Sequence, residues 1–204
     1  MTVPAKSNKA IQRPLIIISF LMLYAAVSLP VIFNPSLKWT SSIVRFAALT
    51  GFVSLFLATL TSAFTRQIYQ IFSRPFMKIH HVFAAIGLIL ITIHPAVLAI
   101  VSMDVSIFLP DISSLGSFLA LGGRPALLLV YVAVIAVFLR RNIVSYWRFV
   151  HGLVYVALVL AYIHGIWIGT DLADPFVAGL FTAMLAISFL VLFYKRYIAW
   201  KRRR

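Results

Sequence analysis

The chain has 204 residues, of which 63% are hydrophobic and 11% are charged. Soluble domains carry roughly 25% charged residues, so this composition excludes an ordinary soluble enzyme and indicates a protein that is solvated by lipid. Eighteen lysines and arginines against four aspartates give a net charge of +14. The basic residues lie between long apolar runs and form no continuous patch, which favours contact with lipid headgroups over nucleic-acid binding.

The absence of cysteine narrows the possible chemistry. Without cysteine the chain forms no disulfide, holds no cysteine-ligated iron–sulfur cluster and attaches no c-type haem covalently. A metal centre in this protein would therefore depend on histidine or oxygen ligands.

Six apolar segments follow one another, each close to the roughly 20 residues that a helix needs to cross a bilayer core. We expect them at Pro14–Phe33, Ile43–Phe64, His80–Ser102, Phe118–Leu139, Trp147–Ile168 and Pro175–Tyr194. The one long connection, Met103–Ser117, contains aspartate, proline, serine and glycine and reads as a surface loop with one amphipathic turn. The sequence thus predicts a single all-α membrane domain over residues 1–204, built as a six-transmembrane-helix bundle.

The basic residues are distributed unevenly among the connections. If the N-terminus is cytoplasmic, 15 of them lie on the cytoplasmic side, and only Lys38, Arg45 and Arg124 lie outside together with all four aspartates. By the positive-inside rule, this asymmetry predicts a multi-pass protein of the plasma membrane with both termini in the cytoplasm. A signal peptide cleaved after Ser28 is the alternative for the first segment, and it leaves the remaining topology unchanged.

All five histidines lie in two of these segments: His80, His81 and His94 in the third, and His151 and His164 in the fifth. An ionisable side chain inside a membrane is costly and is a functional candidate, although a hydrogen bond between helices is the simpler explanation for any one of them. The interval is fourteen positions from His80 to His94 and thirteen from His151 to His164. At about 1.5 Å per residue, these intervals correspond to about 21 and about 20 Å along the helices.

The third and fifth segments run in the same direction, so their histidines would form two pairs at matching depths. We expect His80 to face His151 near the inner surface and His94 to face His164 near the outer surface. Two imidazoles that face one another are the ligands of a six-coordinate b-type haem, whereas a zinc site needs further ligands. The sequence therefore predicts haem b, with two copies expected and one possible.

Two questions about this pairing stay open in the sequence. His81 is an alternative to His80, because it precedes His94 by thirteen positions, the same interval as in the fifth segment. An interval of thirteen also falls about 140° short of a whole number of turns on an ideal helix. Either the fifth helix is overwound near Gly152 or Gly165, or its two histidines bind haems on different flanks.

The segment Trp147-Arg-Phe-Val-His-Gly-Leu-Val-Tyr155, followed by His164, resembles the fifth helix of ferric-reductase-like transmembrane domains. That superfamily includes ferric reductases, NADPH oxidases and the haem-binding membrane subunit of the bacterial periplasmic methionine-sulfoxide reductase system. Thr50-Gly51 and Leu57-Ala-Thr-Leu60 also look like that bacterial subunit, and the fourteen-then-thirteen spacing is similar to the NADPH oxidases. The resemblance covers about residues 43–194, and it implies an inner haem on His80 and His151 and an outer haem on His94 and His164.

The chain departs from the members of the superfamily that it resembles in two ways. The bacterial subunit lacks a histidine at the position of His80, so the present pattern looks closer to the two-haem members. The sequence ends at Lys-Arg-Arg-Arg, where ferric reductases and NADPH oxidases continue, and it contains no Gly-x-Gly-x-x-Gly. We therefore expect no soluble FAD or NAD(P)H domain and no FAD or NAD(P)H site in residues 1–204.

The function expected from these features is transmembrane electron transfer by an oxidoreductase component that is not self-sufficient with NAD(P)H. Its donor would be a separate cytoplasmic flavoprotein or a membrane quinol. Its acceptor would be ferric iron or a periplasmic or extracellular reductase. The alternative is a small membrane transporter or scaffold without a cofactor.

Several other residues are secondary candidates for such a site. Haem propionates could pair with cations near either surface, although the same cations could be interfacial anchors: Arg45 and Arg124 outside, and Arg74, Lys78 and Arg148 inside. The rings of Phe83, Phe149 and Tyr155 could flank a porphyrin or simply pack in helical cores, and Gly87 could admit a macrocycle or a neighbouring helix. The Lys201–Arg204 run would bind anionic lipid or an acidic flavoprotein.

Overall fold

The computed structural model describes residues 7–34 and 37–201, and within these ranges every regular element is helical. Four spans are single helices: α1 (Ser7–Ile32), α2 (Trp39–Ala63), α4 (Phe76–Ser102) and α9 (Pro175–Lys201). The fourth span in chain order consists of α6 (Gly123–Phe138) and the 3₁₀ turn η2 (Leu139–Arg141). The fifth is formed by α7 (Trp147–His151) with α8 (Leu153–Ile168).

The prediction of an all-α protein with six apolar spans is confirmed for the described part of the chain. Six helices there are long and apolar enough to cross a membrane, from 19 to 27 residues each, which indicates a multi-pass membrane protein. Several boundaries differ from the sequence-based expectation: α2 and α4 each begin four residues earlier, and α9 continues to Lys201, seven residues past Tyr194. The segment expected to begin at Phe118 is divided into α5 (Leu115–Ala120) and α6, because the chain turns at Gly122. A Cβ atom on Gly122 would lie 2.8 Å from the carbonyl oxygen of Leu160.

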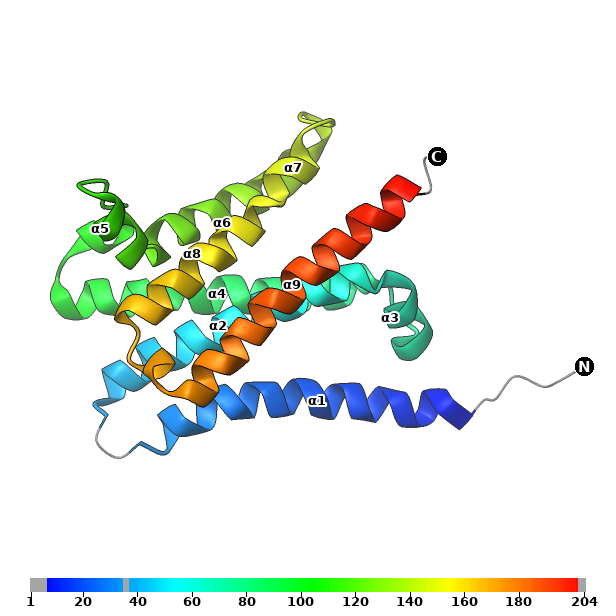
Figure 1. Ribbon diagram of the computed structural model, residues 1–204, viewed down its shortest axis with the longest axis horizontal. Helices are drawn as coiled ribbons and strands as arrows, with labels where there is room; N and C mark the ends of the chain where they lie inside the picture. The colour runs from blue at the N-terminus through cyan, green and yellow to red at the C-terminus, as the bar shows by residue number, and fades with distance from the viewer. Residues whose placement is uncertain (1–6, 35–36, 202–204) are drawn as a thin grey trace, which may run out of the picture.

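The helix α2 is the centre of the bundle. In the most apolar stretch of α2, 67% of the residues are buried, compared with a third or less in the other spans. Figure 1 shows α1, α4 and α9 arranged around it, and all three pack against α2. The helices α6 and α8 form a second packed pair that lies beside α4. The protein therefore consists of one four-helix group around α2 and one helical hairpin.

Two glycines allow α2 and α4 to pack closely. A Cβ atom on Gly51 would lie 2.8 Å from Cγ2 of Ile91, and one on Gly87 would lie 2.8 Å from Cδ2 of Leu55. Small residues let transmembrane helices approach in this way, since lipid supplies no hydrophobic force between them. Of the two roles considered for Gly87, the structure thus shows the close approach of a neighbouring helix.

Hydroxyl groups join the helices within the apolar region. Three such hydrogen bonds of 2.7 Å link α1 to α2, α4 to α6 and α8 to α9, through Tyr24 and Ser54, Thr92 and Tyr131, and Tyr162 and Thr182. Hydrogen bonds of this kind contribute about 0.6 kcal/mol each on average in membranes. They fix the rotation of each helix more than they add to stability.

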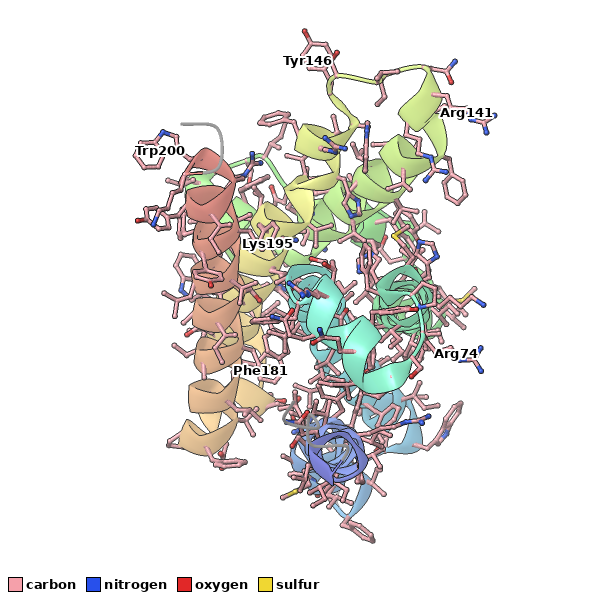
Figure 2. The ribbon with its side chains drawn as sticks, turned by 90° about the vertical axis from the view of Figure 1, so that its right-hand side faces the viewer. Arg74, Arg141, Tyr146, Phe181, Lys195 and Trp200 are labelled. Atoms are coloured by element: carbon pink, nitrogen blue, oxygen red, sulfur yellow. The ribbon has the colours of Figure 1, made fainter. Side chains whose placement is uncertain are left out.

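The start of α1 and the end of α9 lie at the same end of the bundle (Figure 1), beside the short helix α3 (Thr65–Phe72) and the turn between η2 and α7. Figure 2 looks onto this end and shows Arg74 and Arg141 pointing away from the helices. The four aspartates lie at the opposite end, in or beside η1 (Val105–Phe108), α5 and η3 (Asp171–Ala173). The charges are thus segregated along the helices, and we call the two ends the termini end and the loop end.

Candidate functional site

Four of the five histidines form two pairs between α4 and the α7–α8 span. The ring centres of His80 and His151 are 6.3 Å apart, and those of His94 and His164 are 6.5 Å apart. The ring planes cross at 74° and 78°, respectively. We call His80 with His151 the proximal pair, since it is nearer the termini end, and His94 with His164 the distal pair.

Each of these four imidazoles is held by a backbone carbonyl. On α4, Nδ1 of His80 donates to the carbonyl of Ala58 (2.9 Å) and Nδ1 of His94 donates to that of Val44 (3.0 Å). On the α7–α8 span, Nδ1 of His151 donates to the carbonyl of Ala133 (3.0 Å) and Nδ1 of His164 donates to that of Ala120 (2.8 Å). A carbonyl oxygen only accepts, so Nδ1 carries the proton and Nε2 carries the lone pair. This arrangement is typical of metal-binding histidines, in which a hydrogen bond to the second nitrogen fixes the tautomer and the ring orientation.

The carbonyl acceptors repeat at the same spacing as the histidines. Val44 and Ala58 on α2 are separated by fourteen positions, as are His94 and His80 on the antiparallel α4. Gly51 and Gly87 lie halfway between these two contacts, so the seam repeats every seven positions. A repeat of seven is the spacing at which packed helices keep the same faces together. A single register of α4 against α2 therefore places both His80 and His94 at their carbonyl acceptors.

The histidines of the α7–α8 span and their carbonyl acceptors on α5 and α6 also share one spacing, but the interval is thirteen. Ala120 and Ala133 are separated by thirteen positions, as are His164 and His151. The helix tightens between the two histidines at Gly152, where the amide of Tyr155 donates to the carbonyl of Gly152 at 3.0 Å, a 3₁₀-type bond. A 3₁₀ turn advances about 20° more per residue than an α-helix, so this turn makes up part of the angular shortfall of an interval of thirteen. The local overwinding near Gly152 that the sequence analysis considered is thus present.

His81 takes a different position from its neighbour. Its side chain is exposed, and its ring contacts that of His80, with the ring centres 5.8 Å apart. The residue that faces His151 is His80.

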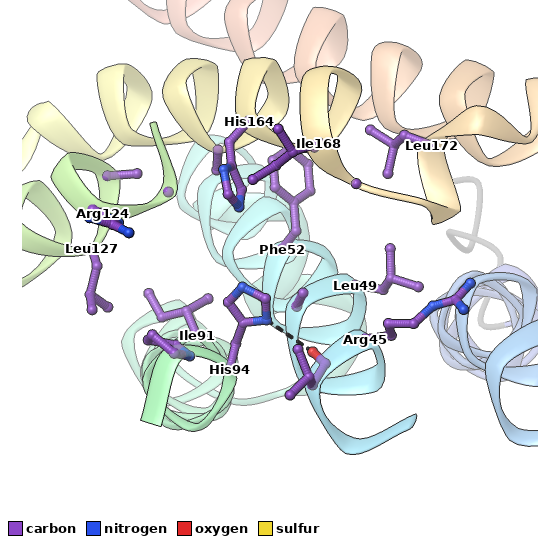
Figure 3. Close-up of a pocket in the computed structure, with 18 of the residues that line it drawn as sticks. Arg45, Leu49, Phe52, Ile91, His94, Arg124, Leu127, His164, Ile168 and Leu172 are labelled. Atoms are coloured by element: carbon purple, nitrogen blue, oxygen red, sulfur yellow. Dashed lines mark hydrogen bonds between the residues drawn. The ribbon is translucent and has the colours of Figure 1, made fainter. Parts of the chain in front are cut away.

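The distal pair lies in the wall of a cavity of about 470 Å³. This volume falls within the roughly 300–1,000 Å³ range of ligand and cofactor sites. Figure 3 shows His94 and His164 pointing toward one another from α4 and α8, with Leu49, Phe52 and Leu127 around them. The lining comes from α2, α4, α6, α8 and α9 and is mainly apolar, as expected of a site for a flat hydrophobic molecule with polar groups at its edge.

Charged groups gather where this cavity approaches the loop end. Arg45 forms an ion pair with Asp171, and both line the cavity. Arg124 also lines it and donates to the carbonyls of Ser106 (3.2 Å) and Leu109 (3.1 Å), which holds η1 over the end of α6. Within this loop, hydrogen bonds from the Ser106 hydroxyl and amide keep the pKa of Asp104 below its usual value.

The remaining sequence candidates have other contacts. Phe83 packs edge-on against Phe20 of α1, and Tyr155 packs against Phe189 of α9. Phe149 is 72% exposed. Arg74 and Lys78 are exposed, and the exposed Arg148 lies over the Trp147 ring, 5.3 Å from its centre. Lys201 is exposed at the termini end, and residues 202–204 lie outside the described part of the chain.

One residue of the distal cavity was missed by the sequence analysis. Asp171 entered it only as a marker of topology, since nothing in the sequence links it to Arg45, which is 126 positions away. A signal was present, because acidic residues are rare in this chain and Asp171 closely follows a span that carries two histidines.

The two pairs fit the axial ligation of haem iron. Imidazole nitrogens bind metals at about 2.0 Å and lie about 1.1 Å from the ring centre, so a metal between two facing rings separates the centres by about 6.2 Å. The observed 6.3 and 6.5 Å are close to this value. Among residues 7–34 and 37–201, no group of three or more His, Cys, Asp or Glu side chains could hold a metal ion. Each pair therefore offers two imidazole donors.

Comparison of the chain with protein-family models, with curated proteins and with solved structures finds no match.

Proposed function

We propose that this protein is a membrane cytochrome with two b-type haems, which passes electrons from one side of the membrane to the other. The observation that carries the proposal is the geometry of four histidines in two opposed pairs, each with Nδ1 bound to a backbone carbonyl. A histidine that only stabilised a helix contact would need one hydrogen bond, without a second imidazole ring beside it. The resemblance to ferric-reductase-like transmembrane domains points to the same function.

His80 and His151 would hold one haem, and His94 and His164 would hold the other. Bound haem supplies reversible one-electron oxidation and reduction of its iron. The chain supplies position: the carbonyls of α2, α5 and α6 fix the four rings, and the apolar lining of the distal cavity excludes water. Hydrogen bonds from Nδ1 also make Nε2 a stronger ligand.

The distance between the two pairs fits within the thickness of a membrane. On α4 the ligands are separated by fourteen positions. This interval is about 21 Å along a helix, within a hydrocarbon core of about 30 Å. With the basic termini end in the cytoplasm, electrons would enter at the proximal pair and leave at the distal pair. The donor would be a flavoprotein or a quinol, and the acceptor would be ferric iron or a reductase outside the membrane.

The direct test is the absorption spectrum of the purified protein. After reduction with dithionite we expect the band of a low-spin b-type cytochrome, and a pyridine haemochrome assay should approach two haems per polypeptide. A folded, colourless protein from cells supplied with haem would reject the proposal and favour the transporter or scaffold alternative.

The separate donor is tested with the same preparation. The chain contains no recognisable nucleotide-binding sequence, so NADPH alone should leave the haem oxidised. Addition of a flavin reductase with NADPH, or of a reduced quinone, should produce the reduced spectrum. Rapid reduction by NADPH alone would show that the chain holds a nucleotide site of its own.

A further inference from the structure

Arg45 and Asp171 form a pair of opposite charges in the wall of the distal cavity. The Nε atom of Arg45 donates to both carboxylate oxygens of Asp171 at 2.9 Å, and its Nη2 group contacts Oδ1 as well. The two side chains are 24% and 13% exposed, so they are largely removed from solvent. The pair joins the start of α2 to η3, next to the walls that present His94 and His164.

The charges in this wall do not cancel. The charged side chains among the described residues that line the cavity are Arg45, Arg124 and Asp171, and together they leave a net charge of +1. Arg124 is occupied by the carbonyls of Ser106 and Leu109, which are neutral acceptors. Asp104 and Asp111, which are not among the lining residues, interact electrostatically with Arg124. Asp171 is thus the one negative charge in the described lining, and it offsets the guanidinium group of Arg45.

Such a charge acts on any centre in the cavity that gains or loses an electron. Oxidation of haem iron adds a positive charge, which a nearby carboxylate stabilises and a nearby guanidinium destabilises. At an effective dielectric constant of about 20, one unit charge at about 10 Å changes such an equilibrium by roughly tenfold. A partly buried charge is screened by salt much less than a charge in solvent.

We propose that Asp171 is a positioning residue that holds Arg45 and neutralises it, and thereby sets the reduction potential of the distal haem. This inference rests on the proposed function, because it needs a redox centre at His94 and His164. It goes further than that function, because it assigns a difference in reduction potential between the two haems to one acidic residue outside both ligand pairs. The proximal haem should be little affected, since it lies about 21 Å further along α4.

The experiment is a redox titration of the purified holoprotein at neutral pH, with the absorbance of each haem followed separately. The Asp171→Asn variant keeps the shape of the side chain but leaves Arg45 positive, so the distal potential should rise. The Arg45→Gln variant leaves Asp171 unpaired, so the distal potential should fall. The double variant restores the net charge and should return close to the wild-type potential. Between the two single variants we expect at least a roughly tenfold difference in the ratio of reduced to oxidised distal haem at a fixed potential.

Asp174→Asn is the matched control. Asp174 is three positions further along the chain, is exposed, and accepts hydrogen bonds from the amides of Phe176 (2.9 Å) and Val177 (3.1 Å) at the start of α9. This substitution removes the same charge from the same loop, but the residue does not line the cavity. We expect its distal potential to stay near that of the wild type.

The outcomes separate the inference from the function on which it rests. Absence of haem from the wild-type protein would overturn the proposed function. Two haems with an unchanged distal potential in Asp171→Asn, or equal shifts of both haems, would overturn this inference alone. Loss of the distal haem in Asp171→Asn, with the double variant failing to restore it, would assign Asp171 to building the site and would also reject the inference.

Discussion

His94 and His164 face each other with their ring planes turned by 78°, and His80 and His151 have nearly the same relation, at 74°. When two axial imidazoles are nearly perpendicular, they act equally on the two iron d orbitals that bind them through π interactions. These orbitals then stay close in energy, and the ferric ion becomes strongly anisotropic. We predict that the oxidised protein shows low-spin electron paramagnetic resonance signals with one very large g value. Well-resolved rhombic signals from both haems would instead indicate parallel imidazole planes.

Each ligand pair should behave as a unit on mutation. His94→Ala and His164→Ala should each remove the distal haem and retain the proximal one, and the double variant should lose no more than either single variant. His80→Ala and His151→Ala should remove the proximal haem. Difference spectra of the purified variants provide the measurement. His81→Ala is the control, since its side chain is exposed, and it should keep both haems. If His94→Ala and His164→Ala remove different haems, the pairing across α4 and α8 is wrong.

Gly123 provides a test of the distal pair that leaves its ligands intact. A Cβ atom at this position would lie 3.0 Å from Cδ2 and 3.1 Å from Nε2 of His164, so an added methyl group presses on the nitrogen that would bind the metal. We predict that Gly123→Ala lowers distal haem content by at least half and leaves the proximal haem in place. The haemochrome assay on protein of equal purity measures this change. Gly179→Ala is the control, because nothing lies within 4 Å of the added atom.

Gly87 should affect both haems together. Its substitution by alanine forces a Cβ atom to within 2.8 Å of Leu55, and this contact lies midway along the α2–α4 seam that places His80 and His94. Overpacking of this kind typically costs about 1–3 kcal/mol. We predict a lower thermal midpoint in detergent and a parallel loss of proximal and distal haem. Loss of one haem alone would show that the two contacts along this seam are independent.

The predicted orientation is accessible to labelling, because the chain has no cysteine. Ser113 and Ser145 are both exposed, and they lie at the loop end and the termini end, respectively. With the termini in the cytoplasm, a cysteine at position 113 should react with an impermeant thiol reagent in intact cells. A cysteine at position 145 should react only after the membrane is opened. The reverse pattern would invert the direction proposed for electron transfer.

The sequence alone was sufficient to predict the six spans, because length and apolar composition act locally along the chain. The structure places them within a few residues of the expected boundaries at most ends, whereas Gly122 divides α5 from α6 within the fourth. The separation of the histidines along each helix was also predictable, because the rise per residue of a helix is constant.

The rotation of each helix was not predictable, and it decides which histidines meet. These helices are apolar on all sides, so no amphipathic period indicates the face that points inward. Whether His80 or His81 faced His151 therefore depended on the packing of α4 against α2, which Gly51 and Gly87 permit. The acceptors of the other two histidines were likewise not predictable, because His151 and His164 bond carbonyls of Ala133 and Ala120 on a neighbouring chain segment.

The sequence by itself determined the all-α class of the protein, its six apolar spans and the spacing of the histidines along them, since each depends on residues that are near one another in the chain. Only the tertiary structure decided the hydrogen-bond acceptor of each imidazole and the partner of Arg45. Val44 and His94 are 50 positions apart, and Arg45 and Asp171 are 126 apart. Contacts over such separations arise from the packing of whole helices, whose register is set by the shapes of many side chains at once.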